Sequence, residues 1–349
     1  MKQKKYIYIL LYVIAGLLFF FFLLAAVFFI DAFFFPERHG LRSDGIWELS
    51  DSEVLVYEMK KNFDINNYNK NYDNFKTNSV GFRDYEFSET KERNIKRILV
   101  FGDSITVGTD SIEYQKDLFS KQMENIISKD ETLKYKYQVY NMGVDGYNTV
   151  QEAENLRLHV AKYKPDIVIV TYCLNDGSQA EIGIYYQILS TFKLGKIGYF
   201  LMGSKLYKAF CQILFEKLKL YKNTDVNDFC DDYWGFDKIY YDNDEYDGKG
   251  FKMFNYLRNK YKFNLYVFIV PALINYNRYG YQLEHKKVYS MLDRYNIKWF
   301  DMLKCFSDVS KDGSFFYSKL RDEVHPNEFG HRLMAEFMYK KLKAENVLN

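Results

Sequence analysis

The sequence has few of the residues that build disulfide-rich, zinc-binding or fibrous proteins. Only 4 cysteines and 4 prolines occur among 349 residues, and no two cysteines are spaced as CxxC. A disulfide framework, a CxxC zinc site and a collagen-like chain are therefore excluded. The net charge of +2 does not point to nucleic acid as a partner. What remains is a globular composition, with 48% hydrophobic and 27% charged residues, and a length suited to one large or two modest domains.

A long run without charge follows the basic N-terminus. Residues 7–30 contain no charged side chain, and Lys2, Lys4 and Lys5 precede them. As a helix this run is about 36 Å long, enough to cross a hydrocarbon core of about 30 Å. It exceeds the apolar stretch of about 7–15 residues in a cleaved signal peptide. We expect an uncleaved single-span anchor with a cytoplasmic N-terminus, which places the chain after Asp31 outside the cytoplasm. A cleaved signal or a buried core helix is the alternative.

Composition divides the rest of the chain into further parts. We expect a cytoplasmic tail and anchor over 1–35, and a polar stalk and lead-in over 36–95. The soluble domain then occupies 96–349 and contains an insert at 178–246.

Short apolar runs alternate with helical patterns in the soluble domain. Such alternation predicts right-handed crossovers and a parallel sheet covered by helices on both faces. One helix is predicted to open with a capping box from Thr149 to Glu152. The expected strands are 98–101, 137–140, 167–172, 265–270 and 297–300, and the expected helices are 117–127, 149–162 and one beginning near Pro326.

Polar residues follow these strands where a parallel sheet places its ligands, at the carboxyl ends. Ser104 ends the segment Gly102-Asp103-Ser104, Gly146 follows the second strand, and Asn175 follows the third. Asp322 and His325 precede the last helix. Acyl transfer needs these parts: a nucleophile, oxyanion donors, and a base with an orienting carboxylate.

Each of these residues also has a purely structural interpretation. A serine after a strand is commonly a helix N-cap. Gly146 could be present simply because a turn needs a positive φ there. Asn175 could belong to a turn or cap. Asp322 could be a surface charge and His325 a hydrogen-bonded loop histidine. The combination at one sheet edge favours the catalytic interpretation over the separate structural ones.

These segments resemble the blocks of the SGNH hydrolases, also called GDSL-type esterases. The resemblance covers about residues 78–345. It departs from the family pattern at Cys173, where the family has glycine, although a small cysteine can fit there. The similar segments are Gly102-Asp103-Ser104, Asn141 to Gly146 with Tyr147-Asn148-Thr149, Asn175-Asp176, Asp322-x-x-His325, and the lead-in Gly81-Phe82-Arg83-Asp84.

The resemblance implies a flavodoxin-like three-layer α/β sandwich with a five-stranded parallel sheet. It implies that Ser104 is the nucleophile, His325 the general base and Asp322 the group that orients the imidazole. The oxyanion donors are then the backbone N–H groups of Ser104 and Gly146 and the side-chain amide of Asn175. It implies no cofactor and no metal.

The expected function is that of a serine esterase, or acyl hydrolase, acting on O-acyl esters, O-acetyl esters included, of cell-envelope glycans or of small molecules. The partners expected are the membrane, through the N-terminal helix, and the ester substrate. An O-acyltransferase that modifies a surface polysaccharide with the same triad is one alternative. A non-catalytic scaffold or binding protein of the envelope is the other.

The insert at 178–246 carries an amphipathic pattern. Its apolar positions share one helical face, with lysines such as Lys205 and Lys208 around it. The expectation is a helix that covers the sheet. The alternative is a lid that shapes the acyl pocket or rests on the membrane surface. The apolar positions are Leu206, Ala209, Phe210, Ile213, Leu214 and Leu218.

Overall fold

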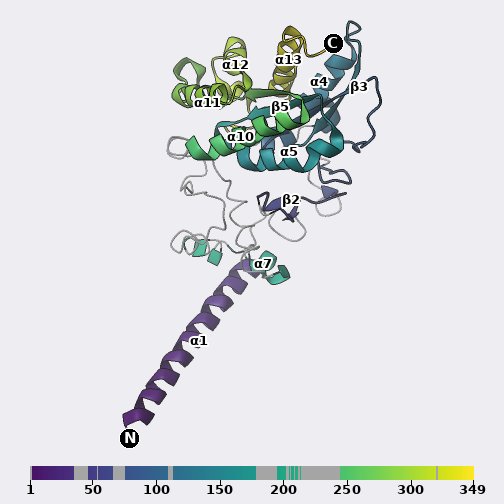
Figure 1. The fold of residues 1–349 in the computed structure, drawn as a ribbon. Helices are drawn as coiled ribbons and strands as arrows, with labels where there is room; N and C mark the ends of the chain where they lie inside the picture. Colours follow the sequence, from purple (N-terminus) through teal and green to yellow (C-terminus); the bar gives the residue numbers. More distant parts are fainter. Residues whose placement is uncertain are drawn as a thin grey trace. The chain divides into compact units, whose positions relative to one another are not determined.

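A computed structural model gives the fold of the chain (Figure 1). Contacts divide it into two compact units, Met1–Trp47 with Ile184–Lys222 and Glu48–Gly183 with Asn223–Asn349. The structure describes residues 2–34, 46–52, 54–65, 75–108, 113–177, 195–201, 204, 206–207, 209–210, 213, 244–319 and 321–349.

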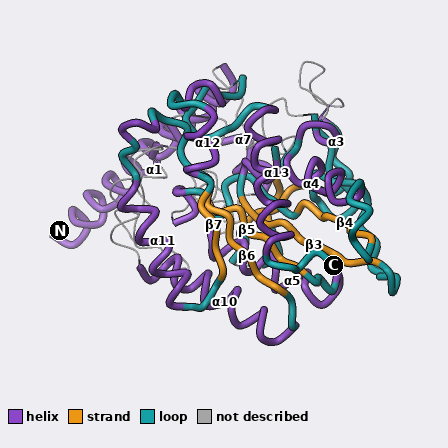
Figure 2. The backbone as a smooth tube through the Cα atoms, turned by 90° about the horizontal axis from the view of Figure 1, so that it is seen from above, coloured by secondary structure: helices purple, strands orange, loops and turns teal. Residues whose placement is uncertain are grey.

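The second unit is built on a five-stranded sheet in the order β4-β3-β5-β6-β7, with every neighbouring pair parallel. This arrangement confirms the expected three-layer sandwich, and Figure 2 shows the strands side by side between helices. The central strand β5, sequence IVIVTY, is buried along its whole length, as a strand covered on both faces must be. The strands are β3 (Ile95–Gly102), β4 (Lys136–Asn141), β5 (Ile167–Tyr172), β6 (Asn264–Ile269) and β7 (Lys298–Asp301).

Helices cover both faces of the sheet. Helix α13 packs on α4 over one face, and α10 packs on α5 over the other (Figure 2). The 3-10 turns are η2 (Leu174–Gly177), η3 (Tyr276–Arg278) and η4 (Gly313–Phe316). The helices of this unit are α2 (Ser104–Val107), α3 (Tyr114–Asp117), α4 (Phe119–Ser128), α5 (Thr149–Tyr163), α10 (Asp244–Tyr261), α11 (Gln282–Arg294), α12 (Leu303–Val309) and α13 (Glu328–Ala344).

Helix α5 has its capping box one residue earlier than the sequence predicted, so the prediction for Thr149 and Glu152 was wrong. Asn148 is the N-cap, and its side-chain oxygen accepts from the backbone N–H groups of Val150 and Gln151 at 3.1 and 3.0 Å. The Gln151 side chain accepts in return from the Asn148 N–H at 3.3 Å. Asparagine and glutamine fill the same two roles as threonine and glutamate, because both carry the oxygen that each role needs.

The described residues from 48 to 95, within the expected stalk and lead-in, belong to the same compact unit as the five-stranded sheet. Strands β1 (Trp47–Leu49) and β2 (Tyr57–Met59) form a small sheet. Tyr57 is fully buried. Its hydroxyl donates to the Asp145 carbonyl at 2.8 Å, and its backbone carbonyl accepts from the Tyr147 hydroxyl at 2.6 Å. Residues upstream of 96 therefore support a loop that follows β4.

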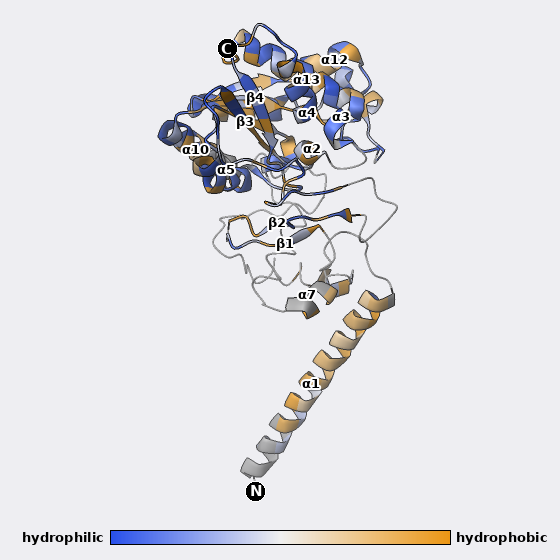
Figure 3. Cartoon of the chain, turned by 90° about the vertical axis from the view of Figure 1, so that its right-hand side faces the viewer, coloured by the Kyte–Doolittle hydropathy of each residue, from blue (hydrophilic) through white to orange (hydrophobic). Residues whose placement is uncertain are grey.

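The first unit contains the apolar N-terminal helix α1 (Lys2–Phe34), which is hydrophobic along most of its length (Figure 3). Among the described residues, this helix alone is long and apolar enough to cross a membrane, over Leu11–Phe33. Only 6% of its most apolar stretch is buried, which excludes the buried core helix. A membrane anchor and a signal sequence both fit these properties.

Candidate active site

Ser104 is the first residue of α2, directly after β3. The cap of this helix is Asp103, whose Oδ1 accepts from the Ile105 N–H at 3.0 Å. Ser104 is therefore not the N-cap that the structural interpretation proposed, and its hydroxyl is not used to cap the helix. The turn from strand to helix depends on Gly102, where a Cβ atom would collide with the side-chain oxygens of Thr106 and Thr171.

A chain of hydrogen bonds joins the three predicted catalytic side chains. The Ser104 Oγ lies 2.8 Å from His325 Nε2. On the other side of the ring, His325 Nδ1 lies 2.8 Å from Asp322 Oδ2. With the Nδ1 proton donated to the carboxylate, Nε2 is left as the acceptor for the serine proton. The structure thus brings Ser104 together with His325, which lies 221 positions later in the sequence, and with Asp322.

Asp322 also shapes the loop that carries His325. Its Oδ1 accepts from the backbone N–H groups of Val324 and His325 at 2.9 and 2.8 Å. The loop is closed by the His325 carbonyl, which accepts from the Ser318 N–H at 3.0 Å, and by a bridge between Tyr317 and Pro326. One carboxylate therefore fixes both the backbone and the imidazole, which explains the spacing of three residues.

Charge and burial set the protonation of this pair. Burial would lower the pKa of His325, but the hydrogen bond and charge of Asp322, helped by the charges of Asp103 and Asp145, raise it above its ordinary value. Burial would likewise raise the pKa of Asp322, but the bonds from His325 and the backbone lower it. The pair is thus suited to stabilise an imidazolium formed during a reaction.

Gly146 and Asn175 both lie at the same edge of the sheet. Gly146 has a φ of 73°, in the left-handed region that the structural interpretation expected. The amide nitrogen of Asn175 donates to Asp103 Oδ2 at 2.9 Å. This hydrogen bond orients the amide group.

Cys173 takes the place of the family glycine without disturbing this arrangement. Its backbone N–H donates to Asp176 Oδ2 at 2.7 Å, and its thiol lies 3.7 Å from Asp103 Oδ1. Burial raises the pKa of the thiol well above its ordinary value, so the thiol stays protonated and is not an activated nucleophile. Asp103, Cys173 and Asp176 offer three possible metal ligands within 4.8 Å. A protonated thiol is a poor ligand, and mutual hydrogen bonds account for the cluster.

Arg83 and Asp84 of the lead-in make contacts behind the site that no pattern in the sequence predicts. Asp84 Oδ2 accepts from the Asn141 N–H at 2.6 Å, and the Asn141 side chain donates to the Thr106 carbonyl at 2.8 Å. Arg83 donates to the Val107 carbonyl at 3.2 Å. Burial raises the pKa of Asp84 to about 7, against the opposing charge of Lys121. The lead-in therefore joins the loop after β4 to the end of α2.

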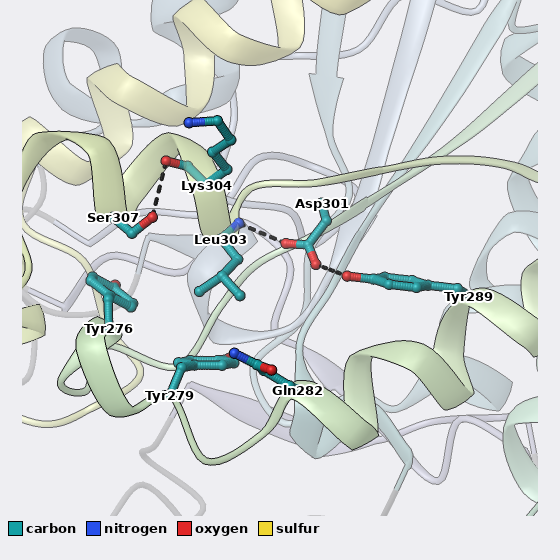
Figure 4. A pocket seen from close by; sticks show the side chains of 8 residues that line it. All are labelled: Tyr276, Tyr279, Gln282, Tyr289, Asp301, Leu303, Lys304 and Ser307. Carbon is teal, nitrogen blue, oxygen red and sulfur yellow. Dashed lines mark hydrogen bonds between the residues drawn. The ribbon is translucent and has the colours of Figure 1, made fainter.

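Asp301, at the end of β7, lines a different hollow of about 400 Å³ (Figure 4) and belongs to a second histidine–aspartate pair. His285 Nδ1 lies 2.6 Å from Asp301, and His285 Nε2 lies 2.8 Å from the Tyr279 hydroxyl. Burial raises the pKa of Tyr279 far above its ordinary value, so this hydroxyl is not activated. Tyr279 accepts from the Ala272 N–H at 3.1 Å, which makes the network a support for the loop after β6.

The fold and the site agree with the comparison against protein families. A model of the family described as GDSL-like lipase/acylhydrolase matches residues 98–338. The chain belongs to this family, and it is a hydrolase that acts on ester bonds. No curated protein matches the chain.

Three of the solved structures that match the chain are TesA, an acetyl xylan esterase and a lipase/acylhydrolase. TesA is 13% identical with a TM-score of 0.42, and the match covers 71% of this chain and 99% of that one. An acetyl xylan esterase, AlAXEase, is 14% identical with a TM-score of 0.39 and coverages of 70% and 99%. The lipase/acylhydrolase from Enterococcus faecalis is 15% identical with a TM-score of 0.39 and coverages of 72% and 96%.

Proposed function

We propose that the protein is a membrane-anchored serine esterase that removes short O-acyl groups, acetyl above all, from glycans or small esters of the cell envelope. The observation that carries the proposal is the hydrogen-bonded chain from Ser104 through His325 to Asp322. An intact chain of this kind argues against the non-catalytic scaffold, which has no need of it.

The reaction follows from the geometry. His325 Nε2 takes the proton of the Ser104 hydroxyl as its oxygen attacks the ester carbonyl, and Asp322 stabilises the imidazolium. The N–H groups of Ser104 and Gly146 and the amide of Asn175 stabilise the oxyanion. His325 returns the proton to the leaving alcohol, which leaves an acyl group on Ser104. Water then attacks this acyl-enzyme with His325 as base, which releases the acid and restores the serine.

A small hollow beside Asn175 supports a short acyl group. Its volume is about 10 Å³, close to that of one water-sized sphere. Apolar side chains such as Ile105, Val270 and Val324 line it, together with Cys173 and Pro271. A methyl group fits such a space, whereas a long acyl chain requires the walls to move.

A series of p-nitrophenyl esters tests the substrate class. We expect kcat/KM to fall by about tenfold or more from acetate to octanoate, since overpacking a well-packed site costs about 1–3 kcal/mol. Repeating the assay with acetylated and free sugars separates two outcomes: acetate release supports hydrolysis, and faster nitrophenol release with an acylated sugar product supports the acyltransferase. A preference for octanoate would contradict the short-acyl proposal.

Replacing Asn175 tests the oxyanion arrangement. We expect Asn175→Ala to lower kcat for p-nitrophenyl acetate by about 10²–10³-fold, because one donor to the oxyanion is lost. The control is Asn259→Ala, which removes an amide from an exposed position on α10. A variant that stays folded by circular dichroism and keeps the wild-type kcat would exclude Asn175 from this role.

The anchor supports the location. The basic residues before α1 favour a cytoplasmic N-terminus, so the catalytic unit is proposed to lie outside the cytoplasm, where acylated glycans occur. On this proposal residues 1–35 are the tail and anchor, and 96–349 hold the hydrolase domain.

A further inference from the structure

The outer end of α1 is covered by part of the insert that follows η2. Asp31 Oδ2 accepts from the Ser204 hydroxyl at 2.7 Å and from the Leu206 N–H at 3.3 Å. The Ser204 oxygen in turn accepts from the Tyr207 N–H at 3.0 Å. The insert is therefore held to the helix by a carboxylate that lies within the apolar stretch Leu11–Phe33.

Aromatic rings add to this attachment. The Phe28 ring lies 5.3 Å from the Tyr207 ring and 5.5 Å from the Phe210 ring, measured between centroids. The Phe29 ring lies 5.2 Å from Phe200 of helix α7 (Gly195–Leu201). Phe28, Phe29 and Asp31, in the last two turns of α1, thus all contact the insert.

The insert turns an apolar face outward. Leu206, Phe210 and Ile213 are spaced as i, i+4 and i+7, the positions of one helical face, and they are 50%, 38% and 58% exposed. On α7, Ile197 and Phe200 are exposed in the same way, whereas Leu201 is buried. Tyr207, next to Leu206 in the sequence, is also buried. We call the exposed set the apolar collar: Ile197, Phe200, Leu206, Phe210 and Ile213.

The collar reverses the usual arrangement of an amphipathic helix in a soluble protein, where the apolar face is covered. It is also continuous with a helix whose own surface is apolar and exposed. The sequence predicted a helix whose apolar face is covered by packing on the sheet, but Leu206, Phe210 and Ile213 are exposed in the structure. Leu214 and Leu218 of the same predicted face lie outside the described residues.

The depth of the attachment indicates what covers the collar. Phe28 lies five residues before Phe33, the end of the apolar stretch, which is about 7.5 Å along a helix. Amphipathic helices at a membrane surface lie about 5–10 Å deep, at the boundary between headgroups and acyl chains. Lys205 and Lys208 interrupt the apolar positions in the sequence, and lysine is common beside such faces.

We propose that the apolar collar is embedded in the lipid headgroup–acyl boundary and that Asp31 holds it there. The proposal rests on α1 as a membrane span, which is part of the proposed function, but it needs no catalysis. The insert segment is then a fixed contact with the lipid surface, and not a lid that binds the acyl group.

Photocrosslinking in the full-length protein tests this placement. Benzoylphenylalanine is introduced at Ile213 or Ile197, and the protein is reconstituted into vesicles of phosphatidylcholine and phosphatidylglycerol. The control position is Leu283 on α11, which is 61% exposed. We expect lipid adducts by mass spectrometry at 213 and 197, several-fold above those at 283. Labelling no higher than at the control, or release of the protein by an alkaline wash, would overturn the proposal.

Substitution of Asp31 tests the attachment. Asp31→Leu removes the hydrogen bonds accepted from Ser204 and Leu206, so lipid labelling from position 213 should fall while the protein stays in the membrane. Asp31→Asn keeps one acceptor oxygen and should retain most of the labelling. Equal labelling in wild type and Asp31→Leu would show that the carboxylate does not hold the collar. Esterase activity is measured in parallel, so a failure of the catalytic proposal is recognised separately.

Discussion

Ser104→Ala is expected to lower kcat for p-nitrophenyl acetate by about 10⁴-fold or more, because no acyl-enzyme can form without the hydroxyl. The Ser104 Oγ lies 2.8 Å from His325 Nε2, and the methyl group of alanine cannot attack an ester carbonyl in its place. A fluorophosphonate probe should label the wild-type protein at this residue and leave the variant unlabelled. The residual rate then reports only binding and oxyanion stabilisation.

The matched control is Ser120→Ala on α4. Ser120 is also fully buried, and its hydroxyl has no hydrogen-bond partner among the described residues. The variant should keep both the fold and the wild-type rate. If Ser104→Ala keeps its activity while it remains folded, the nucleophile must be sought elsewhere.

Asp322→Asn is expected to have the second largest effect, a loss of about 10⁴-fold in kcat, because the amide favours the wrong imidazole tautomer and cannot stabilise the imidazolium. The pH dependence gives a separate signature. Since His325 must be neutral to accept a proton, kcat/KM of the wild type rises with pH through the raised pKa of His325. Without the Asp322 charge, burial dominates and the midpoint should move to lower pH.

The measurement is a pH profile of kcat/KM for both proteins, with Asp308→Asn as the control. Asp308 is an exposed carboxylate paired with Lys304, and its loss should leave the midpoint unchanged. A midpoint that stays in place in Asp322→Asn would mean that another group controls the titration. The raised pKa of Asp145, about 6 through burial, makes that residue the first to examine.

The sequence predicted the sheet well because its strands are short apolar runs with clear ends. Residues 167–172 were predicted and observed as the same strand, and the other four differ by a few residues at their ends. The alternation of strands and helices then predicts parallel pairing, because right-handed crossovers leave few other arrangements. Local patterns of this kind need no knowledge of distant contacts.

The hydrogen bonds that hold the loops around the site could not be predicted in the same way. Tyr57, on a strand of three residues, holds the Asp145 carbonyl, and Asp84 holds Asn141 from a loop. Neither contact leaves a periodic pattern in the sequence, because each joins segments that are far apart in the chain. The capping box of α5 was misplaced because Asn148–Gln151 and Thr149–Glu152 both satisfy the pattern, and only the backbone geometry distinguishes them. The second half of the insert, up to residue 243, lies outside the described residues.

The loop between η4 and α13, which carries Asp322 and His325, comes late in the sequence, and this position decides when a newly made chain can form the proposed triad. Ser104 is synthesised 221 residues before His325, the side chain to which it is hydrogen-bonded. Helix α13, which follows His325, packs on α4. Contacts between such distant residues form late, because the intervening chain must first be ordered. On the proposed mechanism, a polypeptide on the ribosome therefore stays inert at least until residue 325 has been made, and any fragment truncated before residue 325 has no imidazole to accept the Ser104 proton.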